Sequence, residues 1–190
     1  MIEGQGKYNP CPINNSKNMT CADNQQERLI KIGWIVGFVD GEGCFSINFI
    51  KQNDKKEKNR LRRGYRTGYQ VMHEFVVTQG EKSLDSLKYM QRYFNVGNMH
   101  PNKRYDNHKE ILYRYVVRKR EDIIKTIIPF FEKYNLQTSK QDDFRKFVQC
   151  MKLIEKNKHL TKNGLLKIVK ITNSMNRKKS RTELIRILRD

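Results

Sequence analysis

Apolar residues recur at helical spacing from residue 23 onward. The repeating positions of this first segment are Leu29, Ile32, Ile35, Val36 and Val39. Asp23 is the predicted cap of the helix, with Gln26 as its capping-box partner, and Gly41 and Gly43 are predicted to end it. Residues 1–22 contain Gly, Pro, Asn and Ser without periodicity, so we expect a flexible arm before the first helix.

The hydrophobic period changes to two after Gly43, which indicates strands. Phe45 and Ile47 begin an alternation of apolar and polar residues that resumes over residues 69–79. Residues 51–68 between these segments are strongly basic, so we predict a hairpin with a long, positively charged tip. A two-stranded ribbon of this kind fits the major groove of DNA. The same pattern is also typical of a sheet with one solvated face and a disordered basic loop.

The helix–strand–strand unit is then repeated. Periodicity predicts a helix over residues 81–94, strands over 96–100 and 111–118, and a helix over 120–134 in which Pro129 produces a kink. The order predicts an α+β fold with an αββαββα core. Its four-stranded antiparallel sheet would carry the helices on one face and leave the other face bare and basic.

The remaining residues continue as helices, so we expect one domain over residues 23–190. Its core would be residues 23–135, and residues 136–190 would close it with C-terminal helices. The helical segments predicted there are 139–157, 161–175 and 182–188.

The composition narrows the class of partner. The 190 residues include 39 Lys and Arg against 20 Asp and Glu, a net charge of +19, which favours nucleic acid. We expect no membrane partner, because no apolar run is long enough to span a bilayer and the chain starts with a polar segment. The four cysteines form no CxxC pair, so we expect a reduced intracellular protein without zinc fingers. No small-molecule substrate is expected.

Three glycines on the first helix suggest an interface. Gly33, Gly37 and Gly41 are spaced by four residues and form one bare stripe, against which another backbone can approach closely. Glu42 follows at the carboxyl end of the helix, where the helix dipole is already negative. If two copies of the stripe packed together, two such carboxylates would converge and require a divalent metal. The alternative is a core helix with a solvated turn.

Residues 35–43, with the sequence IVGFVDGEG, resemble the signature of the LAGLIDADG homing endonucleases. The predicted αββαββα order agrees with the core of that family. The signature occurs once, which in this family implies a homodimer acting on a long, pseudo-palindromic site in double-stranded DNA. The residues expected at the dimer interface are Gly33, Trp34, Gly37, Phe38, Asp40 and Gly41. Asp40 is assigned to the structure of the helix end, with a hydrogen bond to the partner helix, and a second metal ligand is the alternative role.

The resemblance also implies a catalytic set. Glu42 and the backbone carbonyl near Gly41 would hold Mg²⁺, and Mn²⁺ or Ca²⁺ could occupy the same place. Gln79, at the end of a strand, matches the polar residue that orients water. Lys140 is the nearest candidate for the family's active-site lysine, which would stabilise charge in the transition state.

The predicted DNA contacts lie on the open sheet face, in the basic connections and in a basic turn before the last helix. They are Ser46, Asn48, Ile50, Gln52, Arg63, Arg66, Gln70, Met72, Glu74, Val76, His100, Asn102, Lys103, Arg104, Arg114, Val116, Arg177, Lys178 and Lys179. His73 alternates with core residues, so we interpret it as a buried histidine whose hydrogen bonds are satisfied.

Two other functions fit the same fold. One is an intron RNA-binding maturase, and the other is a DNA-binding protein without catalysis. The presence of Glu42 favours cleavage. Membership of the family would further imply a protein encoded within an intron, located in a chloroplast or mitochondrion, that promotes intron homing.

Overall fold

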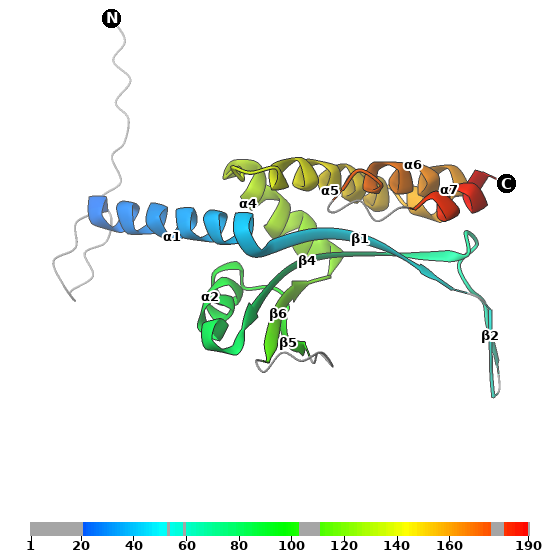
Figure 1. The fold of residues 1–190 in the computed structure, drawn as a ribbon, viewed down its shortest axis with the longest axis horizontal. Coiled ribbons are helices and arrows are strands. Elements are labelled where there is room, and N and C mark those ends of the chain that lie inside the picture. Colours follow the sequence, from blue (N-terminus) through cyan, green and yellow to red (C-terminus); the bar gives the residue numbers. More distant parts are fainter. Residues whose placement is uncertain (1–20, 53, 59, 103–110, 176–180, 190) are drawn as a thin grey trace, which may run out of the picture.

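The structure is a computed structural model that describes residues 21–52, 54–58, 60–102, 111–175 and 181–189. Its main elements follow the order helix, two strands, helix, two strands and helix, after which the chain continues as further helices (Figure 1). The predicted α+β class and the repeated helix–strand–strand unit are confirmed.

A four-stranded antiparallel sheet, in the order β1-β4-β6-β5, is the centre of the fold. Gly43 pairs with Val77, and Val77 pairs in turn with Tyr115, so the three longest strands are in register at the end of the first helix. The elements of this core are α1 (Cys21–Glu42), β1 (Gly43–Lys51), β4 (Tyr69–Gly80), α2 (Leu84–Phe94), β5 (Asn98–Asn102) and β6 (Leu112–Val117).

One face of the sheet forms the hydrophobic core. Six inward side chains on its strands are fully covered: Phe45, Ile47, Phe75, Val77, Tyr115 and Val117. Phe45 contacts the rings of Phe131 and Phe144, and Phe75 contacts Phe94, so helices from both halves of the chain pack on this face. Burial of each such side chain contributes about 1.5–3 kcal/mol, which explains why the alternation specifies this face.

The first helix differs from its prediction at the amino end. It begins at Cys21, so Asp23 lies within the helix and not at its cap. Leu29 was predicted to face the core but is 63% exposed, while Ile32 and Ile35 are buried. Figure 1 shows the reason, since the amino-terminal part of α1 extends beyond the sheet and has no core to contact. Residues 1–20 of the predicted arm lie outside the described residues.

The basic connection between β1 and β4 is not a plain loop. It contains a second small sheet, in which β2 (Lys55–Glu57) pairs antiparallel with β3 (Arg60–Arg62). The Gln52 N–H donates to the Gly68 carbonyl (2.9 Å) and closes the base of this extension. The connection therefore projects beyond the four-stranded sheet as a ribbon (Figure 1).

The third helix contains the predicted irregularity. It consists of α3 (Arg120–Asp122), the π-helical segment η2 (Ile123–Ile127) and α4 (Ile128–Lys133). Pro129 has no N–H to bond to a carbonyl in the preceding turn, and the wider π turn lies directly before it. The kink that Pro129 predicted thus takes the form of a π turn.

Three further helices cover the sheet beside β1 and β4: α5 (Lys140–Glu155), α6 (Lys162–Thr172) and α7 (Thr182–Arg189). The Thr161 hydroxyl caps α6 by accepting from the Gly164 N–H (3.2 Å). Leu165 and Val169 of α6 pack with Leu188 of α7 in a second, smaller cluster. No helix in the described ranges is long and apolar enough to cross a bilayer.

Candidate functional site

The carboxyl end of α1 is held in a tight turn by Gly43. A Cβ atom at Gly43 would lie 2.6 Å from Cγ1 and 2.7 Å from the carbonyl oxygen of Val39, so only glycine fits where the helix passes into β1. Glu42 is the last residue of the helix and is exposed. A carboxylate at this end adds to the negative dipole of the helix, so the position favours a cation.

Lys140 supplies a cation at this point. Its Nζ donates to the carbonyl oxygens of Val39 (3.0 Å) and Gly41 (3.1 Å), which are among the unpaired carbonyls that end α1. Burial lowers the pKa of Lys140, and the negative charges of Asp40 and Glu42 act in the opposite direction. The residue predicted as the active-site lysine therefore lies at the same helix end as the predicted catalytic acid.

Asp40 makes its hydrogen bonds within its own chain. Its carboxylate accepts the N–H groups of Gln137 (2.7 Å) and Thr138 (3.0 Å) and also the Thr138 hydroxyl. The prediction that Asp40 belongs to the structure of the helix end is confirmed. The expected hydrogen bond to a partner helix stays a prediction, and within the single chain both oxygens accept from the turn that precedes α5.

A cavity of about 730 Å³ opens beside these residues. It lies between the end of α1, the outer face of β1 and the start of α5. Arg181 is part of its wall, donates to the Ile47 carbonyl (3.0 Å) and was not selected from the sequence. The lining residues are Asp40, Gly41, Cys44, Ser46, Ile47, Asn48, Thr138, Ser139, Lys140, Asp143, Met175 and Arg181.

Gln79 lies on the strand next to the helix end. It is two residues beyond Val77, the partner of Gly43, and is paired with Tyr113 on β6. Its side chain is half-buried. The register thus places Gln79 on the strand that pairs with β1 directly after Glu42, and its role in orienting water stays a prediction.

The glycine stripe of α1 faces open space. Gly33, Gly37 and Gly41 are exposed, and a Cβ atom built on any of them meets no described atom within 4 Å. Trp34 beside them is 40% exposed and stacks on Phe38 with 4.9 Å between ring centroids. The described part of this chain gives no packing reason for these glycines.

The register of the sheet gathers many predicted DNA contacts on its outward face. Ser46 pairs with Glu74, and Arg114 pairs with both Thr78 and His100, so these side chains share one face. The predicted contacts that this face brings together are Ser46, Asn48, Ile50, Gln70, Met72, Glu74, Val76, His100, Asn102, Arg114 and Val116.

Three of these predicted contacts are buried in the structure. Val76 (7% exposed) and Val116 (3%) are buried by their neighbours on the central strands. Glu74 is 6% exposed and accepts from Arg114 (3.2 Å) and Arg118 (2.9 Å). Its carboxylate is therefore directed to two arginines of the face and is not available to a base.

The described residues include only some of the predicted contacts in the basic connections. Gln52 is half-buried and donates to the Gln70 side chain (3.0 Å), whereas Arg63 and Arg66 are exposed on the β2–β3 ribbon. The predicted contacts outside the described residues are Lys103, Arg104, Arg177, Lys178 and Lys179.

His73 is half-buried, with both ring nitrogens inaccessible to solvent, and its predicted hydrogen bonds are not satisfied. Among the described residues neither ring nitrogen has a partner. Burial lowers the pKa of His73 to about 4, with Arg120 and His159 acting in the same direction. The ring is held neutral among core residues and takes no part in the site at the end of α1.

The donors at the helix end suit a hard divalent cation but are few. Glu42 offers a carboxylate and Gly41 a carbonyl, both oxygen ligands of the kind that Mg²⁺ prefers. Asp40 is fully used by the turn before α5. In the described ranges no three His, Cys, Asp or Glu side chains are grouped to hold a metal. The donor set fits Mg²⁺ if a second copy of the helix end completes it.

The outward face of the sheet, with polar and charged side chains, thus lies beside a helix end where a carboxylate of α1 and a lysine of α5 come together. The family model described as LAGLIDADG endonuclease matches residues 35–151, more than half of the chain. The chain therefore belongs to the LAGLIDADG endonuclease family.

Relatives support this assignment. The chain is 32% identical over 142 residues to "Probable intron-encoded endonuclease 2" of Neurospora crassa, covering 75% of this chain and 26% of that protein. It is 34% identical over 141 residues to "Probable intron-encoded endonuclease 3" of the same organism, covering 74% of this chain and 24% of that protein. The chain thus spans about a quarter of the length of these curated relatives.

Solved structures agree with the fold. The homing endonuclease I-TnaI is 35% identical with a TM-score of 0.64, covering 83% of this chain and 95% of that chain. The LAGLIDADG homing endonuclease I-SmaMI, bound to cleaved DNA, is 33% identical with a TM-score of 0.64, covering 77% of this chain and 44% of that chain.

Proposed function

We propose that this chain is a homing endonuclease that cuts both strands of a specific DNA site as a homodimer. The observation that carries the proposal is the end of α1, where exposed Glu42 and helix-bound Lys140 lie beside an open glycine stripe. Packing of two stripes across a twofold axis would bring two such ends together over one duplex. I-SmaMI, to which the chain is similar, was crystallised with cleaved DNA, which supports a DNA substrate.

The hydrolysis we propose uses Mg²⁺ held by Glu42 and the Gly41 carbonyl, with the second copy contributing its own pair. Bound Mg²⁺ would lower the barrier by stabilising negative charge on the phosphate and the leaving oxygen. I-SmaMI was also crystallised with uncleaved DNA in the presence of calcium ions, which supports a divalent cation in the family. Gln79 would orient the attacking water, and Lys140 would stabilise charge that develops on the phosphate.

DNA recognition would use the outward face of the sheet and the β2–β3 ribbon. Ser46, Asn48 and Gln70 present hydrogen-bonding groups suited to base edges, and Arg63 and Arg66 suit phosphates. Glu74 would act on DNA only through Arg114 and Arg118. Each copy would read one half of a long, roughly palindromic site.

The biological setting we infer is an intron of an organellar gene, with cleavage promoting homing of that intron. Relatives named for introns of ND4 in Podospora anserina and cox1 in Schizosaccharomyces pombe support this setting. They favour the mitochondrion over the chloroplast.

The proposal is tested with a plasmid library of randomised target sites, from which the wild-type protein should select and linearise a subset in Mg²⁺. On a selected site, Glu42→Gln should lower the cleavage rate by about 10³-fold or more, because the carboxylate that holds the metal is lost. Binding of the same duplex should remain. The control is Glu121→Gln, which removes an exposed carboxylate of α3 paired with Lys125 and should cut normally.

Two results would reject the proposal. One is a wild-type protein that linearises no member of the library, which would favour a DNA-binding protein without catalysis or an RNA-binding maturase. The other is normal cleavage by Glu42→Gln.

A further inference from the structure

Asp40 connects the end of α1 to a turn far away in the sequence. The carboxylate accepts from the N–H of Gln137 (2.7 Å), the N–H of Thr138 (3.0 Å) and the Thr138 hydroxyl, and Asp40 and Thr138 are 98 residues apart. Oδ2 accepts from both N–H groups, while Oδ1 accepts from the hydroxyl and, at 3.3 Å, from the Thr138 N–H as well. The side chain therefore fixes two successive residues of the turn.

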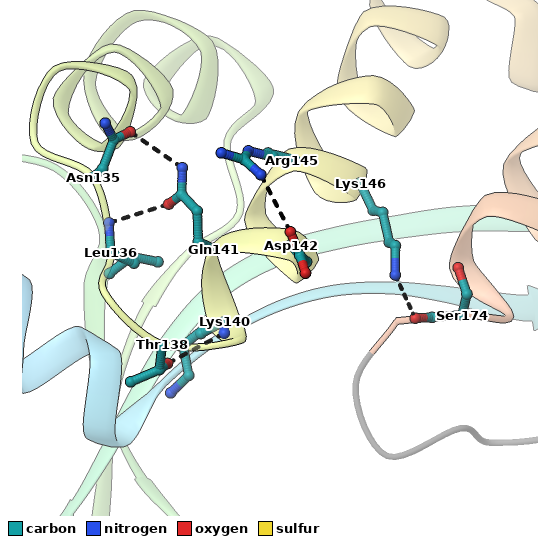
Figure 2. Close-up of polar contacts among 9 residues, drawn as sticks. All are labelled: Asn135, Leu136, Thr138, Lys140, Gln141, Asp142, Arg145, Lys146 and Ser174. Carbon is teal, nitrogen blue, oxygen red and sulfur yellow. Dashed lines mark hydrogen bonds and ion pairs between the residues drawn. The ribbon is translucent and has the colours of Figure 1, made fainter.

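This turn leads directly into Lys140. The Lys140 N–H donates to the Thr138 hydroxyl oxygen (3.2 Å), so the same hydroxyl links the acid to the start of α5. Figure 2 shows the other side of the turn, where the Gln141 side chain accepts from the Leu136 N–H (3.1 Å) and donates to Asn135 (3.1 Å). The backbone that carries Lys140 is thus held on both sides.

The Lys140 side chain contacts the end of α1, the helix that carries Asp40. Its ammonium binds the carbonyls of the two residues that flank Asp40, Val39 and Gly41. The end of α1 and the start of α5 are therefore joined twice. The Asp40 carboxylate of α1 binds the turn before α5, and the Lys140 ammonium of α5 binds the carbonyls of α1. Removing the first connection frees the backbone on which the second depends.

We propose that Asp40 is a positioning residue for catalysis: it locks residues 136–139 so that the Lys140 ammonium stays at the carboxyl end of α1, beside Glu42. The inference rests on the proposed function, since Lys140 is the group whose position matters for cleavage. Asp40 thus has a different task from Glu42, because the hydrogen bonds of the Asp40 carboxylate run to Gln137 and Thr138 in the turn.

A carboxylate is needed for this task. Oδ2 accepts two N–H groups at once, and an amide nitrogen in that place would face a donor with another donor. An amide in the opposite orientation would face the Thr138 hydroxyl and could keep only part of the set. Asp40→Asn should therefore loosen the turn while leaving the size of the side chain unchanged.

The test is a double-mutant cycle in single-turnover cleavage of the selected duplex, with Asp40→Asn, Lys140→Met and both together. Asp40→Asn should lower the cleavage rate by about 10–100-fold, the usual effect of losing a group that orients a functional side chain. Affinity for the duplex should stay within a few-fold. In the Lys140→Met background Asp40→Asn should have no further effect, because its action passes through the lysine.

Matched variants separate positioning from general damage. Asp142→Asn removes an exposed acid two residues after Lys140 that pairs with Arg145 (3.3 Å), and it should cut at the normal rate. Thr138→Ser keeps the hydroxyl and should cut nearly normally, whereas Thr138→Val should resemble Asp40→Asn. Thr138→Val also serves if Asp40→Asn does not fold.

A second readout does not require cleavage. In the protein without DNA, acetylation of Lys140 by a small acylating reagent, followed by mass spectrometry, should be several-fold faster in Asp40→Asn than in the wild type. Lys152, exposed in the last turn of α5, is the internal control and should react at an unchanged rate.

Unchanged protection of Lys140 would overturn the inference. So would a loss from Asp40→Asn that multiplies with that from Lys140→Met. If the wild type cuts no DNA, the proposed function fails, and the acetylation rates still decide whether Asp40 holds the lysine.

Discussion

Single carboxylates in this protein have separate tasks that their surroundings determine. Glu42 is exposed at the end of α1, whereas Asp40, two residues earlier, gives both oxygens to the turn before α5. Glu74 is buried on the sheet face and accepts from Arg114 and Arg118. Hydrogen bonds to a charged group contribute about 1.5–3 kcal/mol each. Asp40 therefore stabilises the turn before α5, and Glu74 stabilises the positions of the two arginines.

Two residues of the candidate site, Glu42 and Lys140, could be selected from the sequence. The contacts between residues far apart in the sequence could not be predicted from it. Glu42 and Lys140 belong to short motifs, so position in the chain was enough to select them. The link from Asp40 to Thr138 joins residues 98 positions apart, and the pair of Glu74 and Arg118 spans 44. Such pairs require the register of the sheet and the packing of α5, which no local pattern specifies.

His73 should make stability depend on pH. Burial lowers its pKa from 6.5 to about 4 in the folded protein, so the unfolded chain binds a proton that the folded chain does not. This contribution to stability is complete above pH 6.5 and is lost as the pH falls toward 4. Urea unfolding at a series of pH values measures it.

Comparison with His73→Phe isolates this contribution from that of the carboxylates. The variant should lose less stability between pH 6.5 and 4 than the wild type does, while His100→Gln, on the exposed face, should behave as the wild type. An equal loss in His73→Phe would show that the histidine is not the source.

At the level of elements, periodicity predicted nearly every helix and strand because the sheet has one buried face. The alternation at Phe45 and Ile47 and again at Phe75 and Val77 specifies that face directly. Periodicity gave no sign of the β2–β3 ribbon, which has no core to pack against. It also placed Leu29 in the core, since helical spacing continues past the point where α1 leaves the sheet.

The glycine stripe of α1 yields a prediction about assembly. Gly37→Leu has room in the single chain, since no described atom lies within 4 Å of the added Cβ, and leucine favours helix over glycine by up to about 1 kcal/mol. The variant should therefore keep or raise the melting temperature measured by circular dichroism. It should lose association in sedimentation equilibrium, because its side chain separates the two helices.

A matched control adds the same side chain elsewhere. Lys170→Leu places leucine on the exposed face of α6 and should associate like the wild type. Association of Gly37→Leu at the wild-type strength would mean that the stripe is not the dimer contact.

At the scale of the whole molecule, different parts of the chain have complementary tasks. One face of the sheet forms the core, and the outward face and the ribbon carry hydrogen-bonding and basic groups. The end of α1 carries Glu42, and Lys140 of α5 binds the carbonyls there. A net charge of +19 favours binding along the phosphates of a long duplex. In the proposed homodimer, each chain would contribute half of the symmetric arrangement that cuts two strands.

The most direct measurement is a crystal structure of the wild-type protein on a selected duplex with Mg²⁺. The proposed function predicts two copies of the chain on one duplex, with their glycine stripes in contact and each Glu42 carboxylate at a phosphate that is cut. A single copy on the duplex, or Glu42 remote from every cut phosphate, would contradict it.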